Sequence, residues 1–140
     1  MSYIGLALSE ESRDGLLREF RTLGTPIAHH MTVIMEVKTE DLSRKAPVFC
    51  AEDIGKNFKL QVTGVARSYG VEAVVVALLK DDGSLISEGI VDVKRTHIPH
   101  ITVATDGVTK PFKSNELLKN GYQNIENGLI LECVLCTVQD

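Results

Sequence analysis

Short runs with strand periodicity dominate the hydrophobic pattern of this chain, and a few stretches at helical spacing interrupt them. The chain opens with an apolar run, continues with leucines and a phenylalanine three to four positions apart, and then returns to apolar and β-branched residues. This pattern predicts a strand over Tyr3–Leu8, a helix that begins after the N-cap Ser9 and stops at Gly24, and a strand over Ile27–Val37.

The middle of the chain carries two further strand patterns between polar segments. Phe58–Val65 alternates apolar and polar residues, whereas Val71–Leu79 is a nearly continuous apolar run typical of a buried strand. The segments around these strands are a predicted loop over 38–57 with a short element at 48–50, a turn at 81–84, and a segment over 85–93 that fits either a strand or a short helix.

The last third predicts two more strands and one short helix. A strand is expected over Ile98–Thr105, followed by a turn, and Ser114 is placed to cap a short helix that Gly121 ends. The final strand, Leu129–Val138, turns alternate apolar side chains to one face. The 140 residues contain no linker, low-complexity tract or charge block, so the sequence predicts an α+β fold in a single domain over residues 1–140.

One tripeptide occurs twice in these strands, as His30–Thr32 and as His100–Thr102, half of the chain apart. Random placement of the histidines and threonines would give about 0.3 such matches, so the pair carries information. Side chains at i and i+2 of a strand share a face. Each His therefore projects beside its Thr, with Met31 or Ile101 turned to the other side.

Two imidazoles and two hydroxyls around one small volume suit chemistry on a phosphodiester. One imidazole removes a proton from the attacking oxygen and the other protonates the leaving oxygen, while hydroxyls donate hydrogen bonds to the phosphate oxygens. An ordinary imidazole pKa of about 6.5 lets one ring be neutral and its partner protonated near neutral pH. The alternative is a pair of ordinary half-buried strand histidines.

Composition narrows the choice of partners. A net charge of −4, three Tyr, four Phe and no Trp argue against an extended nucleic-acid surface and leave a small nucleotide or a single RNA end. Three cysteines without a secretion signal indicate reduced thiols and a cytoplasmic protein, and no apolar run is long enough to cross a membrane. The sequence leaves the oligomeric state open.

The remaining histidines and cysteines receive structural interpretations. His29 points away from His30, and His97 precedes the second motif without an assigned role. The four histidines lack metal-ligand spacing and an acidic cluster, so no metal site is predicted. Cys133 and Cys136 face opposite sides of a strand and are interpreted as structural thiols.

The stretch Pro99–Thr105, leading to Lys110–Leu118, resembles the cyclic phosphodiesterase domain of fungal-type tRNA ligases and related RNA-repair proteins. These proteins belong to the 2H phosphoesterase superfamily, whose hallmark is a pair of His-x-Thr strands. The resemblance implies a two-lobed, pseudo-symmetric fold in which antiparallel sheets line a central cleft and helices lie outside. It also implies metal-independent chemistry without a cofactor, and a site made by His30, Thr32, His100 and Thr102.

Three further residues are candidates for lining the cleft. Tyr3 is one because first strands often border the site in this superfamily, although packing at a strand end explains it equally well. Ser114 and Asn115 either shape one wall of the site or simply begin a helix.

The resemblance implies hydrolysis of a 2′,3′-cyclic phosphate on a nucleotide or an RNA end. Two alternatives stay open. One is degradation of cyclic oligonucleotide or 2′-5′-linked messengers, as some viral members do, and the other is a nucleotide-binding protein without turnover. The sequence does not assign which histidine is the base and which the acid, nor whether opening leaves a 2′- or a 3′-phosphate.

Overall fold

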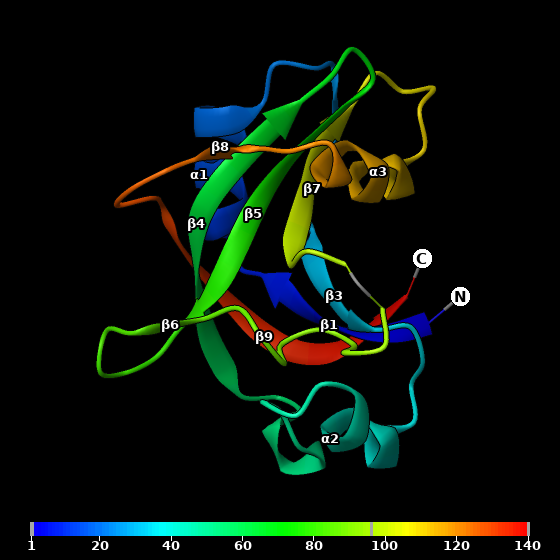
Figure 1. The fold of residues 1–140 in the computed structure, drawn as a ribbon, viewed down its shortest axis with the longest axis vertical. Coiled ribbons are helices and arrows are strands. Elements are labelled where there is room, and N and C mark those ends of the chain that lie inside the picture. The colour runs from blue at the N-terminus through cyan, green and yellow to red at the C-terminus, as the bar shows by residue number, and fades with distance from the viewer. Residues whose placement is uncertain (1, 96, 140) are drawn as a thin grey trace.

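Nine strands form one antiparallel sheet in the computed structural model, which describes residues 2–95 and 97–139 (Figure 1). The sheet order is β2-β7-β5-β4-β9-β1-β3, with β6 paired to β5 and β8 paired to β4. The predicted α+β class is therefore confirmed. The strands are β1 (Ser2–Leu8), β2 (Thr25–Pro26), β3 (His30–Ile34), β4 (Asn57–Arg67), β5 (Val71–Leu79), β6 (Leu85–Ile86), β7 (His100–Thr105), β8 (Gln123–Asn124) and β9 (Ile130–Gln139).

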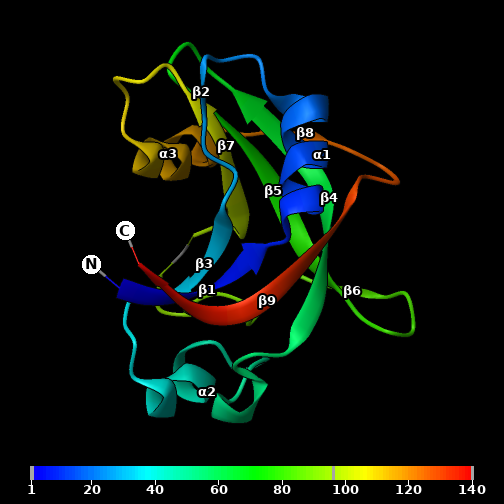
Figure 2. The same cartoon turned by 180° about the vertical axis from the view of Figure 1, so that it is seen from behind.

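Short helices cover both faces of this sheet. In the two opposite views, α1 lies on one side of β4, β5 and β7, and α3 lies on the other (Figures 1 and 2). The helix α2 and its neighbouring turns lie below β1 and β9 (Figure 1). The helices are α1 (Glu10–Phe20), α2 (Leu42–Lys45) and α3 (Ser114–Lys119), with 3-10 turns η1 (Thr39–Asp41), η2 (Ala51–Asp53) and η3 (Pro111–Lys113).

The helix α1 begins where the sequence predicts and ends earlier. Ser9 is its N-cap, and the Ser9 hydroxyl accepts a hydrogen bond from the Ser12 N–H at 3.1 Å. The helix ends at Phe20 rather than at Gly24 because the buried Glu72 carboxylate accepts the backbone N–H groups of the next residues. Thr22 N and Leu23 N lie 2.8 and 2.9 Å from Oε1 of Glu72.

The strand predicted over Ile27–Val37 is shorter in the structure, where β3 spans only His30–Ile34. Ala28 interrupts it with a φ of 48°, a left-handed conformation that an extended strand does not contain. The same segment joins the two ends of the sheet, since β2 pairs with β7 and β3 pairs with β1. The connection between β2 and β3 therefore determines how closely the two ends approach.

The structure also gives the conformation of two regions for which the sequence predicts a loop or an ambiguous element. The segment 38–57 contains α2 and two 3-10 turns, and its apolar island contributes the buried side chain of Phe49. Within 85–93, only Leu85–Ile86 is a strand and the remainder is turn and coil. The predicted strands over 58–65, 71–79, 98–105 and 129–138 are confirmed to within three residues at each end.

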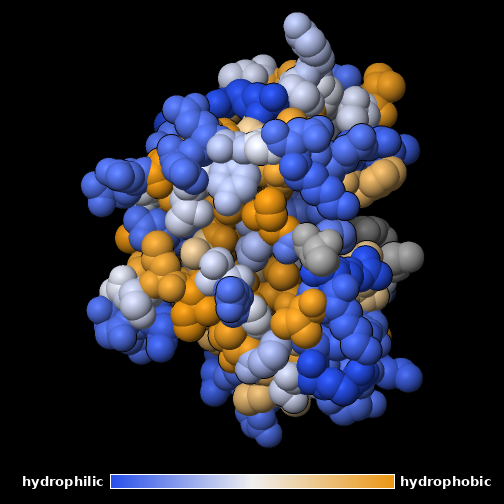
Figure 3. Space-filling model, viewed as in Figure 1, coloured by the Kyte–Doolittle hydropathy of each residue, from blue (hydrophilic) through white to orange (hydrophobic). Residues whose placement is uncertain are grey.

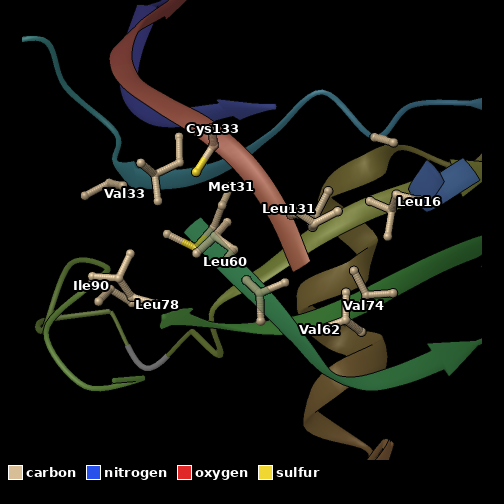
Figure 4. Packing of buried hydrophobic residues seen from close by; sticks show 14 of the residues in the cluster. Leu16, Met31, Val33, Leu60, Val62, Val74, Leu78, Ile90, Leu131 and Cys133 are labelled. Carbon is tan, nitrogen blue, oxygen red and sulfur yellow. The ribbon is translucent and has the colours of Figure 1, made fainter. Parts of the chain in front are cut away.

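Two apolar clusters lie on opposite faces of the strands β4 and β5. The larger joins α1 to β3, β4, β5 and β9, and Figure 4 shows Leu16, Met31, Val62, Val74 and Leu131 pointing into it. The smaller lies under α3 and consists of Ala66, Ala73, Val75 and Leu118. Alternate residues of β5 therefore serve the two cores, which explains why its sequence is apolar throughout.

Candidate functional site

The first motif lies on β3 with its polar side chains turned away from the large core. Met31 and Val33 are 1% and 2% exposed, whereas His30 and Thr32 between and beside them are half-buried. The second motif repeats this arrangement on β7, where Ile101 is buried and His100 and Thr102 are half-buried. Strand alternation thus places each His beside its Thr, as the sequence predicts.

The connection between β2 and β3 brings the two motifs together. Ala28 N donates to Thr102 O at 2.9 Å, and one residue later the chain crosses to β1, where Leu8 N donates to His29 O at 2.9 Å. His30 is only two residues beyond the bond to Thr102. Strands β3 and β7 accordingly lie side by side although they are not paired in the sheet (Figures 1 and 2).

Hydrogen bonds define the orientation of the His100 ring. Its Nδ1 lies 2.7 Å from the carbonyl oxygen of Ile98, and its Nε2 lies 3.0 Å from Oγ of Ser114. A carbonyl only accepts, so Nδ1 carries the hydrogen and donates it. In the neutral ring, Nε2 is then the nitrogen with the free electron pair.

Burial favours this neutral form of His100. Loss of solvation lowers its pKa below the ordinary 6.5; the bond to Ile98 opposes that effect, and the charge of His97 adds to it. The net shift is downward. At neutral pH the ring is therefore suited to take up a proton at Nε2.

Ser114 links the second motif to α3. Its Oγ is 2.9 Å from Oγ1 of Thr102 and 2.9 Å from the carbonyl oxygen of Pro111, and the side chain is fully buried. The single hydrogen of this hydroxyl is donated either to that carbonyl or to Nε2 of His100. The prediction that Ser114 caps the helix is wrong, because its hydroxyl is engaged with β7 and Lys113 is the N-cap position. Its complete burial also excludes it as a nucleophile in this conformation, so it serves to position His100 and Thr102.

Tyr3 makes the corresponding contact with the first motif. Its hydroxyl lies 2.7 Å from Nε2 of His30, and the two rings are 5.0 Å apart at their centroids. Each histidine of the pair therefore has Nε2 beside a hydroxyl from another element. The structure brings Tyr3 into the site as the sequence suggests, and the bond explains its position better than packing at a strand end does.

Asn115, the third candidate for lining the cleft, lies beside the second motif. It follows Ser114 in α3 and is half-buried, and its Oδ1 is buried without a hydrogen-bond partner among the described residues. No bond joins it to either motif in the part of the chain that the structure describes. Asn115 thus lies next to a site residue without contacting the histidines by a hydrogen bond.

A groove of about 680 Å³ adjoins the second motif. His97, Ile98 and Pro99, which precede His100, form part of its wall, and Val75, the sheet partner of His100, contributes to its floor. A larger hollow of about 980 Å³ lies near the turn at 81–83, and none of the four motif residues lines either hollow. Sequence reasoning identified neither the groove nor the role of the Ile98 carbonyl, because a backbone atom carries no sequence signal.

His29, Cys133 and Cys136 agree with their structural interpretation. His29 is exposed, and burial together with the charge of Arg13 lowers its pKa. Cys133 is buried, which raises the pKa of its thiol to about 12, and Cys136 on the opposite face is half-buried. Among residues 2–95 and 97–139, no group of three or more His, Cys, Asp or Glu side chains is arranged to hold a metal ion.

No family model matches the chain, and no curated protein matches it. Within the described residues, no helix has the length and apolar character needed to cross a membrane. The geometry of the two motifs is therefore the basis for any functional assignment.

Proposed function

We propose that this chain is a phosphodiesterase of the 2H type that hydrolyses a 2′,3′-cyclic phosphate. One observation carries the proposal: two His-x-Thr tripeptides present His and Thr on the half-buried face of neighbouring strands, with the residue between them buried in each. In this proposal β4, β5 and β7 form one lobe, β9, β1 and β3 form the other, and the motifs meet between them. Three free thiols accord with a reducing, cytoplasmic location.

The hydrogen bonds support different roles for the two histidines, one as general base and the other as general acid. His100 is the general base: its Nε2 takes a proton from water, and the water oxygen forms a bond to phosphorus. His30 is the general acid: it gives a proton to the ribose oxygen as the bond between that oxygen and phosphorus breaks. The product is a phosphomonoester with one free ribose hydroxyl, and one proton has been taken up and one released.

The threonines and the two neighbouring hydroxyls complete this mechanism. Thr32 and Thr102 donate to the non-bridging phosphate oxygens, on which charge builds in the transition state. Ser114 holds Thr102 and His100 in one orientation, and its hydroxyl can turn to the Pro111 carbonyl when the electron pair on Nε2 is needed. The sequence resemblance and the size of the adjoining groove, within the range of small-molecule sites, both accord with a nucleotide substrate.

Turnover in EDTA is the decisive measurement. The panel contains the four 2′,3′-cyclic mononucleotides, an oligoribonucleotide that ends in a cyclic phosphate, and several cyclic dinucleotides. The wild type is compared with His30→Ala and His100→Ala, and with His29→Ala as a matched control on the opposite face. We expect each motif variant to lose at least about 10²-fold in kcat/KM and the control to keep its activity.

An activated leaving group separates the acid from the base. A nucleoside p-nitrophenyl phosphodiester releases a phenolate that needs little protonation, so it should restore much of the activity of His30→Ala but not that of His100→Ala. If the activated substrate restores the activity of His100→Ala instead, then His100 is the general acid and His30 the general base, and the proposed hydrolysis is unchanged.

Two results would replace the proposal. Fastest turnover of a cyclic dinucleotide would make messenger degradation the function of the same site. No turnover of any compound, together with nucleotide binding that survives both substitutions, would identify a binding protein.

A further inference from the structure

The groove beside the second motif contains side chains that the proposed hydrolysis does not use. Its floor includes Val75, whose Cα partner in the sheet is His100, so these two side chains lie next to each other on one face. Figure 3 shows apolar side chains gathered in the middle of this face of the molecule, between hydrophilic regions above and below. None of the four motif residues lines the groove, but Val75 places it next to His100.

The opposite wall of the groove is tied to the first motif. Asp92, which lines the groove, donates its backbone N–H to Val33 O at 2.9 Å, and Val33 follows Thr32 directly. The neighbouring Val93 N donates to Lys45 O at 2.8 Å. Backbone bonds therefore hold this wall against β3 and α2, and the groove is formed before any ligand enters.

An aromatic ring completes the lining. Tyr122 is 41% exposed and lies against β4 at Gly64, where the ring carbon Cδ2 is only 2.7 Å from the place that a Cβ would occupy. Only glycine leaves room for the ring in this position. The exposed part of Tyr122 therefore forms a fixed aromatic surface in the groove wall.

The charged side chains of the groove have mixed signs. Glu88 and Asp92 contribute two carboxylates and Arg95 contributes one guanidinium, and the pKa of His97 is lowered by burial and by the charge of Arg95. The excess of carboxylates disfavours a second phosphate in the groove. A flat ligand with N–H donors toward the carboxylates and an oxygen or nitrogen acceptor toward the guanidinium matches this set of groups.

We propose that the groove binds the nucleobase of the substrate and favours guanine. Guanine presents adjacent N–H donors for a carboxylate and the O6 and N7 acceptors for a guanidinium, whereas uracil offers one N–H between two carbonyl oxygens. The base stacks on Tyr122 while its cyclic phosphate lies between the two histidines. This inference rests on the proposed function, because it assumes that the phosphate is attached to a nucleoside.

The test compares guanosine and uridine 2′,3′-cyclic phosphates as substrates. For the wild type we expect kcat/KM to be about tenfold higher with the guanosine compound. Glu88→Gln should bring the ratio close to one, because the amide replaces a double acceptor by a donor and an acceptor. Glu88 is exposed, so the substitution preserves the fold, and Glu126→Gln, an exposed glutamate outside the groove, is the matched control that should keep the preference.

A second variant probes the aromatic surface. Tyr122→Ala should raise KM for the guanosine compound about tenfold with little change in kcat, whereas Tyr122→Phe should retain the wild-type value.

Calorimetric titration with guanosine and uridine 3′-monophosphates separates this inference from the hydrolysis. Turnover with equal kcat/KM for all four bases would overturn the base site and leave the hydrolysis standing. Absence of turnover, with guanosine 3′-monophosphate bound preferentially and the preference lost in Glu88→Gln, would overturn the hydrolysis and support the base site. If the protein neither hydrolyses any of the cyclic phosphates nor binds guanosine 3′-monophosphate preferentially, both the hydrolysis and the base site are overturned.

Discussion

The hydroxyl of Tyr3 lies 2.7 Å from Nε2 of His30 and joins the first strand of the sheet to the first motif. We predict that Tyr3→Phe keeps the fold, because the ring still fills its buried position, and lowers kcat/KM by about tenfold, as expected for the loss of one hydrogen bond to a catalytic group. Steady-state kinetics checks this, with thermal unfolding as the control for stability. Unchanged kinetics would mean that the bond only supports packing.

Ser114 should influence the site through its hydroxyl rather than through its volume. Ser114→Ala removes the partner of His100 Nε2 and of Thr102 Oγ1, so we expect kcat/KM to fall by about tenfold and the pH profile of kcat/KM to change its shape. Asn115→Ala, next to it in α3, is the control and should leave the profile unchanged. A fall in activity at constant profile would indicate a purely structural role for Ser114.

The pH dependence of kcat/KM should report the pKa of His100. Burial lowers this pKa below 6.5, and a general base works only in its neutral form. The acid side of the pH profile should therefore have its midpoint below pH 6.5, where the ring takes up a proton. Rates measured from pH 4.5 to 8 test this, and an acid-side midpoint above pH 6.5 would contradict it.

Glu72 should contribute strongly to stability. Its carboxylate is 1% exposed and accepts hydrogen bonds from Thr22, Leu23 and Arg67. Burial raises its pKa, but these bonds lower it by more, so the net shift is downward. The stabilisation is thus present above the ordinary value of 4.5 and is lost as the pH falls through the folded pKa.

We expect Glu72→Ala to lower the free energy of unfolding by about 2–4 kcal/mol at pH 7, because it leaves buried N–H groups without their acceptor. Glu19→Ala, on the exposed side of α1, should change it by less than about 0.5 kcal/mol. Chemical denaturation measures both. Equal effects of the two substitutions would show that the end of α1 does not depend on Glu72.

Two glycines should respond in opposite directions to substitution by alanine. A Cβ on Gly128 would clash with the carbonyl oxygen of Val62, so Gly128→Ala must displace the backbone between β4 and β9 and should cost about 2 kcal/mol or more. Gly15 lies within α1 and its Cβ would meet no atom closer than 3.9 Å, so Gly15→Ala should stabilise the protein by about 0.5–1 kcal/mol. Chemical denaturation tests both substitutions: at an unchanged m-value, the midpoint should fall for Gly128→Ala and rise for Gly15→Ala.

Local patterns in the sequence predicted most of the secondary structure of this protein. Alternation identified the strands β4 and β9, apolar β-prone runs identified β5 and β7, and Ser9 located the start of α1, because these signals depend on neighbours in the chain. The same alternation placed His30 beside Thr32 and His100 beside Thr102, since side-chain direction in a strand follows from position alone.

Features that depend on distant residues were not accessible in this way. The end of α1 depends on Glu72, about fifty positions further along the chain. Ser114 does not cap α3, because its hydroxyl contacts His100 and Thr102 of β7 instead. The short length of β3 and the meeting of the two motifs depend on the turn at Ala28, where one connection joins both ends of the sheet. Sequence patterning thus determined what each strand presents, whereas tertiary structure alone decided which strands meet, because hydrogen bonds between remote segments set that geometry.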